Sequence, residues 1–267
     1  MINYKGDVLE KINNIDYDNT YVILDFDHTI TDGGEDSVST IGLIAKSGIL
    51  GSEYADIRKR IYDFYRPIEL DLSIKEEVRT MFLKQWLENQ ICLYGYYGLT
   101  LEKLDEIFKR EKQLLIPRDG MSNFLKQLHD CNMPVLIISA GLGDNIERFL
   151  KQNECYYENI KVISNFLNFE NGIVCKTKSD LIHITNKNSA FSNDDPHIKG
   201  REQIIAIGDS ISDIDMIPND KKADALKIGF LDEKLENFDK YMEVFDIVCT
   251  ENTSFNEVGN LIKKKVR

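Results

Sequence analysis

Short apolar runs bounded by glycine and polar residues recur along the chain, and they predict the strands of a buried sheet. They lie at residues 21–24, 134–138, 160–164 and 203–207. Between them, residues 121–131 and 144–152 place apolar side chains at helical spacing. Because strands and helices alternate, the chain is expected to be an α/β protein built on a doubly wound parallel sheet.

Residues 33–117 interrupt this alternation. Three segments there carry apolar residues at helical spacing, at 53–66, 74–94 and 101–115, and Thr100 is a candidate N-cap for the last one. No segment in this stretch alternates as a strand would. We therefore predict a helical cap domain at 33–117, inserted after the first strand of a catalytic core formed by residues 1–32 and 118–267.

A β-hairpin is expected at residues 165–176. Asn171-Gly172 has the chemistry of a tight turn, and residues compatible with strands flank it on both sides.

Composition limits the class of protein. The chain has 267 residues, of which 42% are hydrophobic, enough for a core domain with an insert. No apolar run approaches the roughly 20 residues of a membrane span, and the polar N-terminal segment does not resemble a signal peptide. The five cysteines are scattered without a CxxC pair, which favours reduced thiols and a cytoplasmic location.

Charge limits the partners. The net charge of −12 repels nucleic-acid backbones, so no polynucleotide partner is expected. A small phosphorylated substrate remains compatible with this charge, because a metal ion and a few local cations offset the field inside a pocket. Nothing in the sequence indicates a membrane partner or an obligate protein partner.

The segment Asp25-Phe26-Asp27-His28-Thr29 directly follows the first apolar run. Side chains alternate along a strand, so Asp25 and Asp27 leave it on the same side. Two adjacent carboxylates repel each other unless a cation or a proton separates them, and Mg²⁺ prefers such oxygen ligands. A lone Asp-x-Asp is more often a solvated turn, but its place at the end of a buried strand favours a metal site.

Three further signals lie later in the chain. Ser139-Ala140-Gly141 precedes a predicted helix and suits a phosphate cradle. Lys187 would supply a fixed cation for a phosphate among carboxylates. Gly208-Asp209-Ser210 leads to Asp213, which adds acidic groups at another strand end. Each signal is common by itself, but the serine and Asp209 elements follow predicted strands, and ligands in doubly wound sheets bind beyond the carboxyl ends of strands.

Together the four motifs resemble the signatures of the haloacid dehalogenase (HAD) phosphatase superfamily, in the same order, and the insert resembles its first class of helical cap. Longer stretches are similar to the cytosolic 5′-nucleotidase III family, also called pyrimidine 5′-nucleotidases. They are residues 62–71, 139–147, 162–172, 181–187 and 208–213.

This resemblance implies a Mg²⁺-dependent phosphohydrolase that forms a phosphoaspartate on Asp25. It implies that Asp27 acts as general acid and then as general base. Ser139, Ala140 and Lys187 would bind the phosphate. The metal would be held by Asp25, the backbone carbonyl of Asp27 and Asp209, with Asp213 in support.

The predicted cap departs from the family pattern. The family has adjacent aromatic residues and then a histidine-containing segment, whereas residues 85–90 read QWLENQ here. Trp86, Tyr65 and Gln90 are the candidates for substrate recognition, although aromatic residues at helical spacing more often pack in a core.

Three functions remain open at this point. The first is hydrolysis of nucleoside 5′-monophosphates. The second is hydrolysis of another small phosphate, such as phosphoserine or a sugar phosphate. The third is a catalytically silent protein that binds phosphate metabolites, and the intact acidic motifs count against it.

Overall fold

A seven-stranded sheet forms the centre of the computed structural model, which describes residues 1–6, 8–34, 36–71, 73–232, 235–250 and 253–263. The strand order is β1-β9-β8-β7-β2-β3-β4, and only β1 is antiparallel to its neighbour. The strands are β1 (Ile2–Tyr4), β2 (Thr20–Leu24), β3 (Val135–Leu142), β4 (Ile160–Asn165), β7 (Gln203–Gly208), β8 (Leu226–Leu231) and β9 (Ile247–Thr250).

The predicted parallel sheet is confirmed. All four apolar runs form strands, and β2 is buried along its whole length between β3 and β7. Strand β3 runs further than predicted, through Leu142, but its pairing with β4 becomes irregular between Ile138 and Leu142. The segment Ser139-Ala140-Gly141 therefore leaves the regular ladder, which frees its backbone for other contacts.

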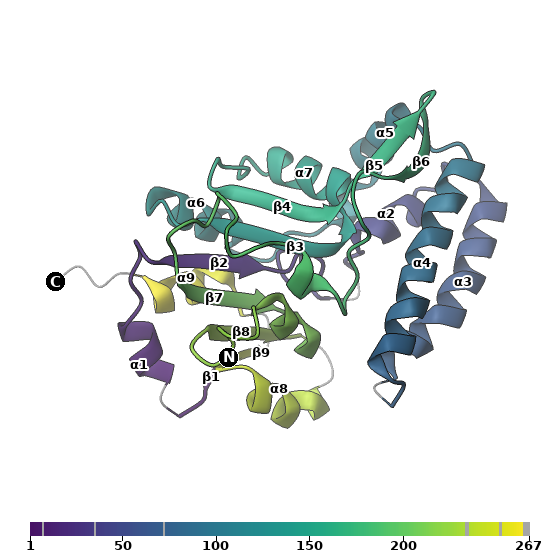
Figure 1. Ribbon diagram of the computed structural model, residues 1–267. Helices are drawn as coiled ribbons and strands as arrows, with labels where there is room; N and C mark the ends of the chain where they lie inside the picture. The colour runs from purple at the N-terminus through teal and green to yellow at the C-terminus, as the bar shows by residue number, and fades with distance from the viewer. Residues whose placement is uncertain (7, 35, 72, 233–234, 251–252, 264–267) are drawn as a thin grey trace.

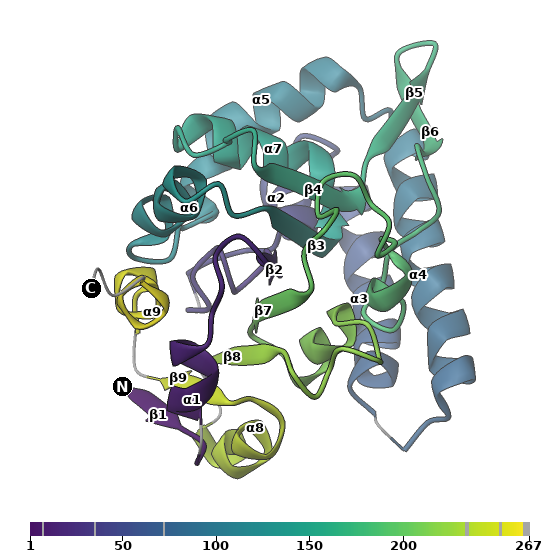
Figure 2. The same cartoon turned by 60° about the vertical axis from the view of Figure 1, so that its left-hand side comes forward.

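Alternating side chains of β2 enter two cores. Val22 and Leu24 pack in the core under α6 (Met121–Asp130), α7 (Gly143–Gln152) and α9 (Phe255–Ile262). Tyr21 and Ile23 pack on the opposite face, with residues of the short 3₁₀-helix η3 (Ile211–Met216). Figure 2 shows α6, α7 and α9 on one side of the sheet. The α1 helix (Val8–Asn13) and α8 (Phe238–Val244) pack near the β8–β9 end.

The insert is helical, as predicted. Its three expected helices are α3 (Ser52–Leu70), α4 (Glu76–Tyr96) and α5 (Leu101–Glu111), the last followed by the 3₁₀-helix η1 (Lys112–Leu114). The hydroxyl of Thr100 accepts from the Lys103 amide and caps α5, as expected. An additional helix, α2 (Thr40–Lys46), was not predicted. The division into core and cap domains itself remains a prediction.

Helices α3 and α4 pack side by side and stand beyond one end of the sheet (Figure 1). The predicted hairpin is present as β5 (Leu167–Glu170) and β6 (Ile173–Thr177), and α4 packs against β6. The arrowheads of β4 and β7 point toward α3 and α4 in Figure 1. Side chains at the carboxyl ends of these strands therefore lie on the side that the two helices cover. Within the described residues, no helix is both long and apolar enough to cross a membrane.

Candidate active site

Three carboxylates meet at the carboxyl edge of the sheet. Asp25 follows β2, Asp209 follows β7, and Asp213 lies in η3. The two strands are parallel neighbours in which Leu24 pairs with Ile207, so Asp25 and Asp209 emerge close together. One oxygen from each of the three carboxylates lies within 4.8 Å of the other two.

Lys187 joins two of these carboxylates. Its Nζ donates to Asp25 Oδ1 at 2.5 Å and to Asp213 Oδ1 at 2.8 Å, and the side chain is only 4% exposed. Burial by itself lowers the pKa of Lys187, but the attraction of the two carboxylates outweighs it and raises that pKa. The site therefore contains a permanent ammonium group.

The remaining charge in the cluster is not balanced by this lysine. Burial raises the pKa of Asp209, and repulsion from Asp213 and Asp25 raises it further. Burial also raises the pKa of Asp25 to about 6, although Lys187 acts in the opposite direction. Three acids facing one lysine in a buried place favour a second cation. The oxygen ligands suit Mg²⁺, so the donor set fits the predicted metal.

The Asp27 side chain forms its hydrogen bonds with Thr40 and not with this cluster. Its carboxylate accepts from the backbone N–H of Thr40 at 2.8 Å and from the Thr40 hydroxyl at 3.0 Å, at the start of α2. Burial raises the pKa of Asp27, and the hydrogen bonds from Thr40 lower it in part. The group of carboxylates able to hold a metal is Asp25, Asp209 and Asp213, so Asp27 contributes no side-chain ligand to it.

The irregular carboxyl-terminal part of β3, residues 139–141, packs against Asp27. Ser139 is buried, and its hydroxyl accepts from the Gly141 amide at 3.0 Å. A Cβ atom on Gly141 would lie 2.1 Å from Thr40 Oγ1 and 2.7 Å from Asp27 Oδ2. The absence of a side chain at this position is therefore what allows this segment to approach Asp27. The carbonyl of Ala140 accepts from the side-chain amide of Asn165 at 2.9 Å, which holds the other side of this segment.

The three predicted recognition residues, Trp86, Tyr65 and Gln90, lie in α3 and α4 of the helical insert. Trp86 and Tyr65 stack with ring centroids 5.9 Å apart and planes 6° from parallel. Gln90 is 4% exposed and donates to the Tyr54 hydroxyl at 3.1 Å, between α3 and α4. Gln90 is thus occupied inside the helix pair, whereas Trp86 is partly exposed.

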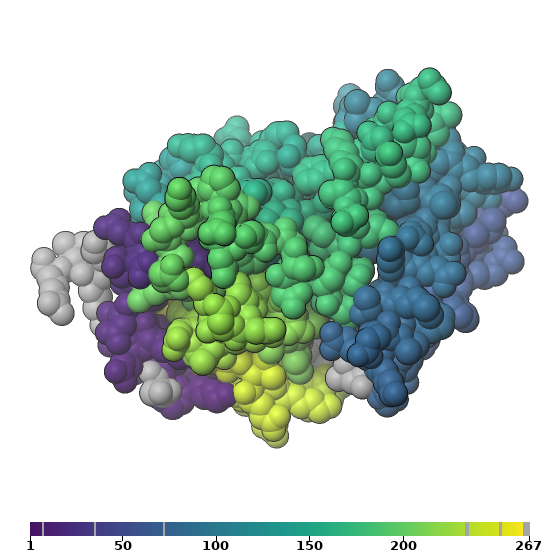
Figure 3. All heavy atoms as spheres, in the orientation of Figure 1, coloured from purple at the N-terminus to yellow at the C-terminus, as the bar shows by residue number. Residues whose placement is uncertain are grey.

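Other residues of the insert reach the site. Thr80 of α4 shares a 2.7 Å hydrogen bond with Thr185, which lies two residues before Lys187. Burial lowers the pKa of His183, and Lys84 of α4 lowers it further. In Figure 3 the blue surface of α4 adjoins the green surface of the segment that contains His183 and Thr185. The α4 helix therefore covers the loop that carries Lys187.

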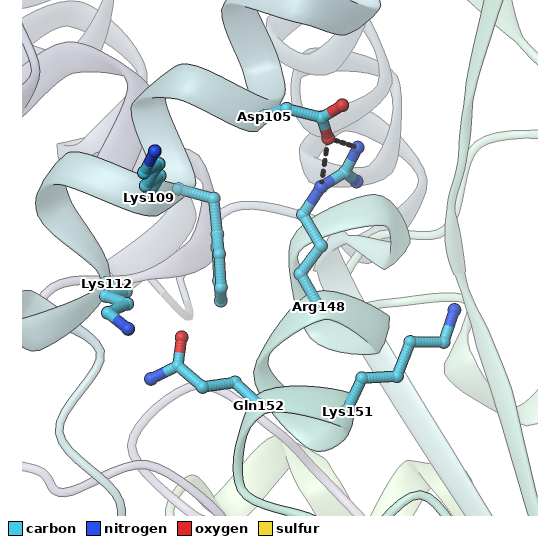
Figure 4. A pocket seen from close by; sticks show the side chains of 7 residues that line it. Asp105, Lys109, Lys112, Arg148, Lys151 and Gln152 are labelled. Atoms are coloured by element: carbon cyan, nitrogen blue, oxygen red, sulfur yellow. Dashed lines mark hydrogen bonds and ion pairs between the residues drawn. The ribbon is translucent and has the colours of Figure 1, made fainter.

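A separate hollow of about 330 Å³ lies between α5 and α7 (Figure 4). Its lining includes Lys109, Lys112 and Arg148, and Arg148 is paired with Asp105 at one edge of the hollow. No residue of the acidic cluster lines it. The concentration of titratable groups, and not this surface hollow, marks the candidate active site.

Sequence reasoning missed Thr40, which binds Asp27 and also accepts from the Leu142 amide at 3.0 Å. The available signal was the pair Ser39-Thr40 before an apolar segment, which is typical of a helix N-terminus. Ser39 caps α2 by accepting from Gly42. The role of Thr40 itself depends on the fold, because 13 residues separate it from Asp27.

Comparison with known proteins places the chain among proteins described as 5′-nucleotidases. The family model for pyrimidine 5′-nucleotidase (UMPH-1) matches residues 27–266. A 7-methylguanosine phosphate-specific 5′-nucleotidase from Drosophila melanogaster is 31% identical over 252 residues, covering 90% of this chain and 78% of that protein. Nucleotidase A of the same description from Xenopus laevis is 30% identical over 251 residues, covering 91% and 86%.

Solved structures give the fold. The crystal structure of cytosolic 5′-nucleotidase IIIB bound to cytidine matches with a TM-score of 0.85 and 28% identity, covering 98% of this chain and 92% of that one. An apo phosphoserine phosphatase matches with a TM-score of 0.60 and 21% identity, covering 91% and 98%, which supports the fold alone. The chain thus has the HAD-like α/β fold that its motifs predicted, and it is a phosphomonoester hydrolase that belongs to the pyrimidine 5′-nucleotidase (UMPH-1) family.

Proposed function

We propose that this protein is a Mg²⁺-dependent 5′-nucleotidase that hydrolyses nucleoside 5′-monophosphates through a phosphoaspartate on Asp25. The observation that carries the proposal is the buried Asp25–Lys187–Asp213 network beside Asp209. Family membership and the relatives named as 5′-nucleotidases support a nucleotide as the substrate.

Asp25 and Asp209 would hold the metal through their carboxylates and Asp27 through its backbone carbonyl, while Asp213 orients the site. Bound Mg²⁺ would supply charge neutralisation for the phosphoryl group and for the carboxylates around it. Asp213 is suited to support because both of its oxygens have partners. One accepts from Lys187, and the other accepts from the amides of Asp209 and Ser210 at 3.1 and 2.9 Å.

Asp25 would attack the phosphorus in line with the departing 5′-oxygen, forming an acyl phosphate as the phosphorus–oxygen ester bond breaks. Lys187 already contacts Asp25, so it would stabilise negative charge on the transferring group and on the phosphoaspartate. The Ser139 hydroxyl and the backbone of Ala140 would bind the remaining phosphoryl oxygens. This assignment fits their place in the irregular end of β3, just before the α7 N-terminus.

Asp27 would donate a proton to the departing 5′-oxygen and then accept one from the water that hydrolyses the intermediate. Burial supports the first step because it favours the protonated carboxyl. The two hydrogen bonds from Thr40 support the second step, since they stabilise the carboxylate and fix its direction. Thr40 therefore adds a positioning contact to the proposed acid–base residue.

The segment 33–117 would act as the cap domain that admits the nucleoside. The partly exposed Trp86 is proposed to form its aromatic surface, supported by the buried Tyr65 on which it stacks, and Gln90 would act indirectly by holding Tyr54 between α3 and α4. Arg66 of α3 also lies near the acidic cluster. Burial lowers its pKa, but the attraction of Glu69, with a smaller one from Asp209, raises it overall.

The test is phosphate release with Mg²⁺ from a panel of substrates. It includes cytidine, uridine, purine and 7-methylguanosine 5′-monophosphates, phosphoserine and sugar phosphates. We expect turnover of at least one nucleotide and none by Asp25→Asn with its fold intact. Clear activity on another class without nucleotide turnover would overturn the substrate assignment. Full activity of Asp25→Asn would overturn the mechanism.

A further inference from the structure

One buried arginine, Arg118, binds the backbone of the turn that follows the proposed catalytic residues Asp25 and Asp27. Arg118 is 3% exposed, and it lies just after the helical insert, outside the four sequence motifs. Its Nε donates to the Thr29 carbonyl at 2.8 Å, and its Nη2 donates to the His28 carbonyl at 2.5 Å. One guanidinium thus binds two successive carbonyls of the turn that follows Asp27.

This turn has a demanding conformation. His28 has a φ of +66°, in the left-handed region that residues other than glycine enter at a cost. The next side chain, Thr29, is fully buried, and its hydroxyl donates to Asp209 Oδ1 at 2.9 Å. The backbone conformation at His28 therefore decides whether Thr29 reaches a proposed metal ligand.

The other edge of the guanidinium is fixed by Asp232. Arg118 Nη1 and Nη2 donate to the two Asp232 oxygens at 2.9 and 2.6 Å, a bidentate pair, and the guanidinium lies over the Phe230 ring at 4.0 Å. The Gly33 backbone lies against the carboxylate of Asp232, because a Cβ at that glycine would be 2.1 Å from Asp232 Oδ2. Phe230 and the Gly33 backbone thus pack against the Arg118–Asp232 pair, which restricts how the two side chains can be oriented.

We infer that the Arg118–Asp232 pair is a positioning device for the metal site. It holds His28 in the left-handed conformation, and through Thr29 it directs Asp209 toward the ligand position. This inference rests on the proposed function, because it assumes that Asp209 binds Mg²⁺. Lysine cannot replace Arg118 here, since an ammonium lacks the planar fork that serves two carbonyls and a carboxylate together.

The experiment is direct titration of Mg²⁺ alone into the whole protein by calorimetry, alongside nucleotide hydrolysis as a function of Mg²⁺. In Arg118→Lys we expect Mg²⁺ affinity to fall by about tenfold, as for other supporting contacts around metal ligands. The KM for nucleotide at saturating Mg²⁺ should stay unchanged. Asp232→Asn provides a second variant and should weaken Mg²⁺ binding in the same direction.

Arg201→Lys is the matched control. Arg201 also binds backbone carbonyls, those of Tyr17 and Thr20 at 2.5 and 2.9 Å, but it does so at the amino end of β2. A purely structural role for Arg118 would make both variants less stable and leave both Mg²⁺ affinities unchanged. That result would overturn the inference.

A double-variant cycle tests the route through Thr29. Thr29→Val removes the donor to Asp209, so adding Arg118→Lys to it should weaken Mg²⁺ binding no further. Additive losses would contradict the route. Wild-type protein that neither binds Mg²⁺ nor hydrolyses nucleotides would instead refute the proposed function. Normal wild-type activity with unaltered Mg²⁺ binding in both Arg118→Lys and Asp232→Asn would refute only the positioning role.

Discussion

Replacing Lys187 with methionine would remove the ammonium that donates to Asp25 and Asp213 while keeping a long side chain of similar shape. Both carboxylates are buried, and within the described part of the chain Lys187 is the only basic residue that forms an ion pair with either of them. Breaking a buried ion pair by removing one partner costs about 3–5 kcal/mol, because the remaining charge stays buried. Lys187→Met should therefore lose a large share of a typical stability of about 5–15 kcal/mol.

The pH dependence of this loss follows from the carboxyl pKa values. Burial raises the pKa of folded Asp25 from 3.8 to about 6, and without Lys187 it would rise further. Between the unfolded pKa of 3.8 and the raised folded pKa, the folded variant binds more protons than the unfolded chain. Its stability therefore falls as pH rises from 3.8 through the folded pKa. The destabilisation by Lys187→Met should thus be larger at pH 8 than at pH 5.

The assay is urea unfolding followed by circular dichroism, with a chelator present so that no metal replaces the lost cation. The double variant Lys187→Met with Asp25→Asn should be more stable at pH 8 than Lys187→Met alone, because it lacks one unpaired carboxylate. Lys126→Met is the control, since that lysine pairs with Asp130 on the exposed surface of α6 and should matter little. Unchanged stability at pH 8 in Lys187→Met, or a further loss in the double variant, would refute the reasoning.

Three other predictions concern the same site. Mg²⁺ at 100 times its dissociation constant should stabilise the protein by about 2.7 kcal/mol, measured as a rise in unfolding temperature that Asp209→Asn abolishes; an equal rise in the variant would exclude Asp209 as a ligand. Thr40→Val should lower kcat roughly tenfold with little change in KM, because it removes a hydrogen bond to the Asp27 carboxylate, and Thr40→Ser should recover most of the rate. Gly141→Ala should reduce kcat by about 10²-fold by displacing Asp27, while Gly6→Ala, which meets no atom within 4 Å, should be neutral; normal turnover by Gly141→Ala would contradict the proposed packing.

The centre of the fold could be predicted because its strands are buried on both faces and read as continuous apolar runs. Strands β2, β3 and β7 have this pattern, and β4, at the edge of the sheet, has it only in part, with Lys161 and two other half-buried positions inside the strand. The other strands gave weaker signals: β8 reads LKIGFL, with a lysine and a glycine inside it, while β1 and β9 have only three and four residues. Helix α2 has seven residues, too few turns for its periodicity to be recognised from the sequence.

The acidic and cationic residues of the candidate site could be located for a similar reason. Asp25 and Asp209 directly follow buried strands, and the ends of parallel strands meet whatever the length of chain between them. Lys187 has no such position, and it was suggested only by the need for a fixed cation among the carboxylates and by its place among the family motifs. The structure brings it to Asp25 and Asp213 through the short 3₁₀-helix η2 (Lys187–Ser189), which no periodic pattern announces.

The supporting contacts escaped prediction because their acceptors are backbone carbonyls. Arg118 binds the carbonyls of His28 and Thr29, and Tyr241 donates to the carbonyl of Asp209 at 2.6 Å. Every residue has a carbonyl, so the sequence shows the donor but never the acceptor. Such donors stand apart only once the fold shows them buried, as Arg118 is beside Asp232. Because these contacts fix the backbone around the proposed metal site, substitutions there should change how tightly Mg²⁺ is bound before they change which nucleotide is accepted.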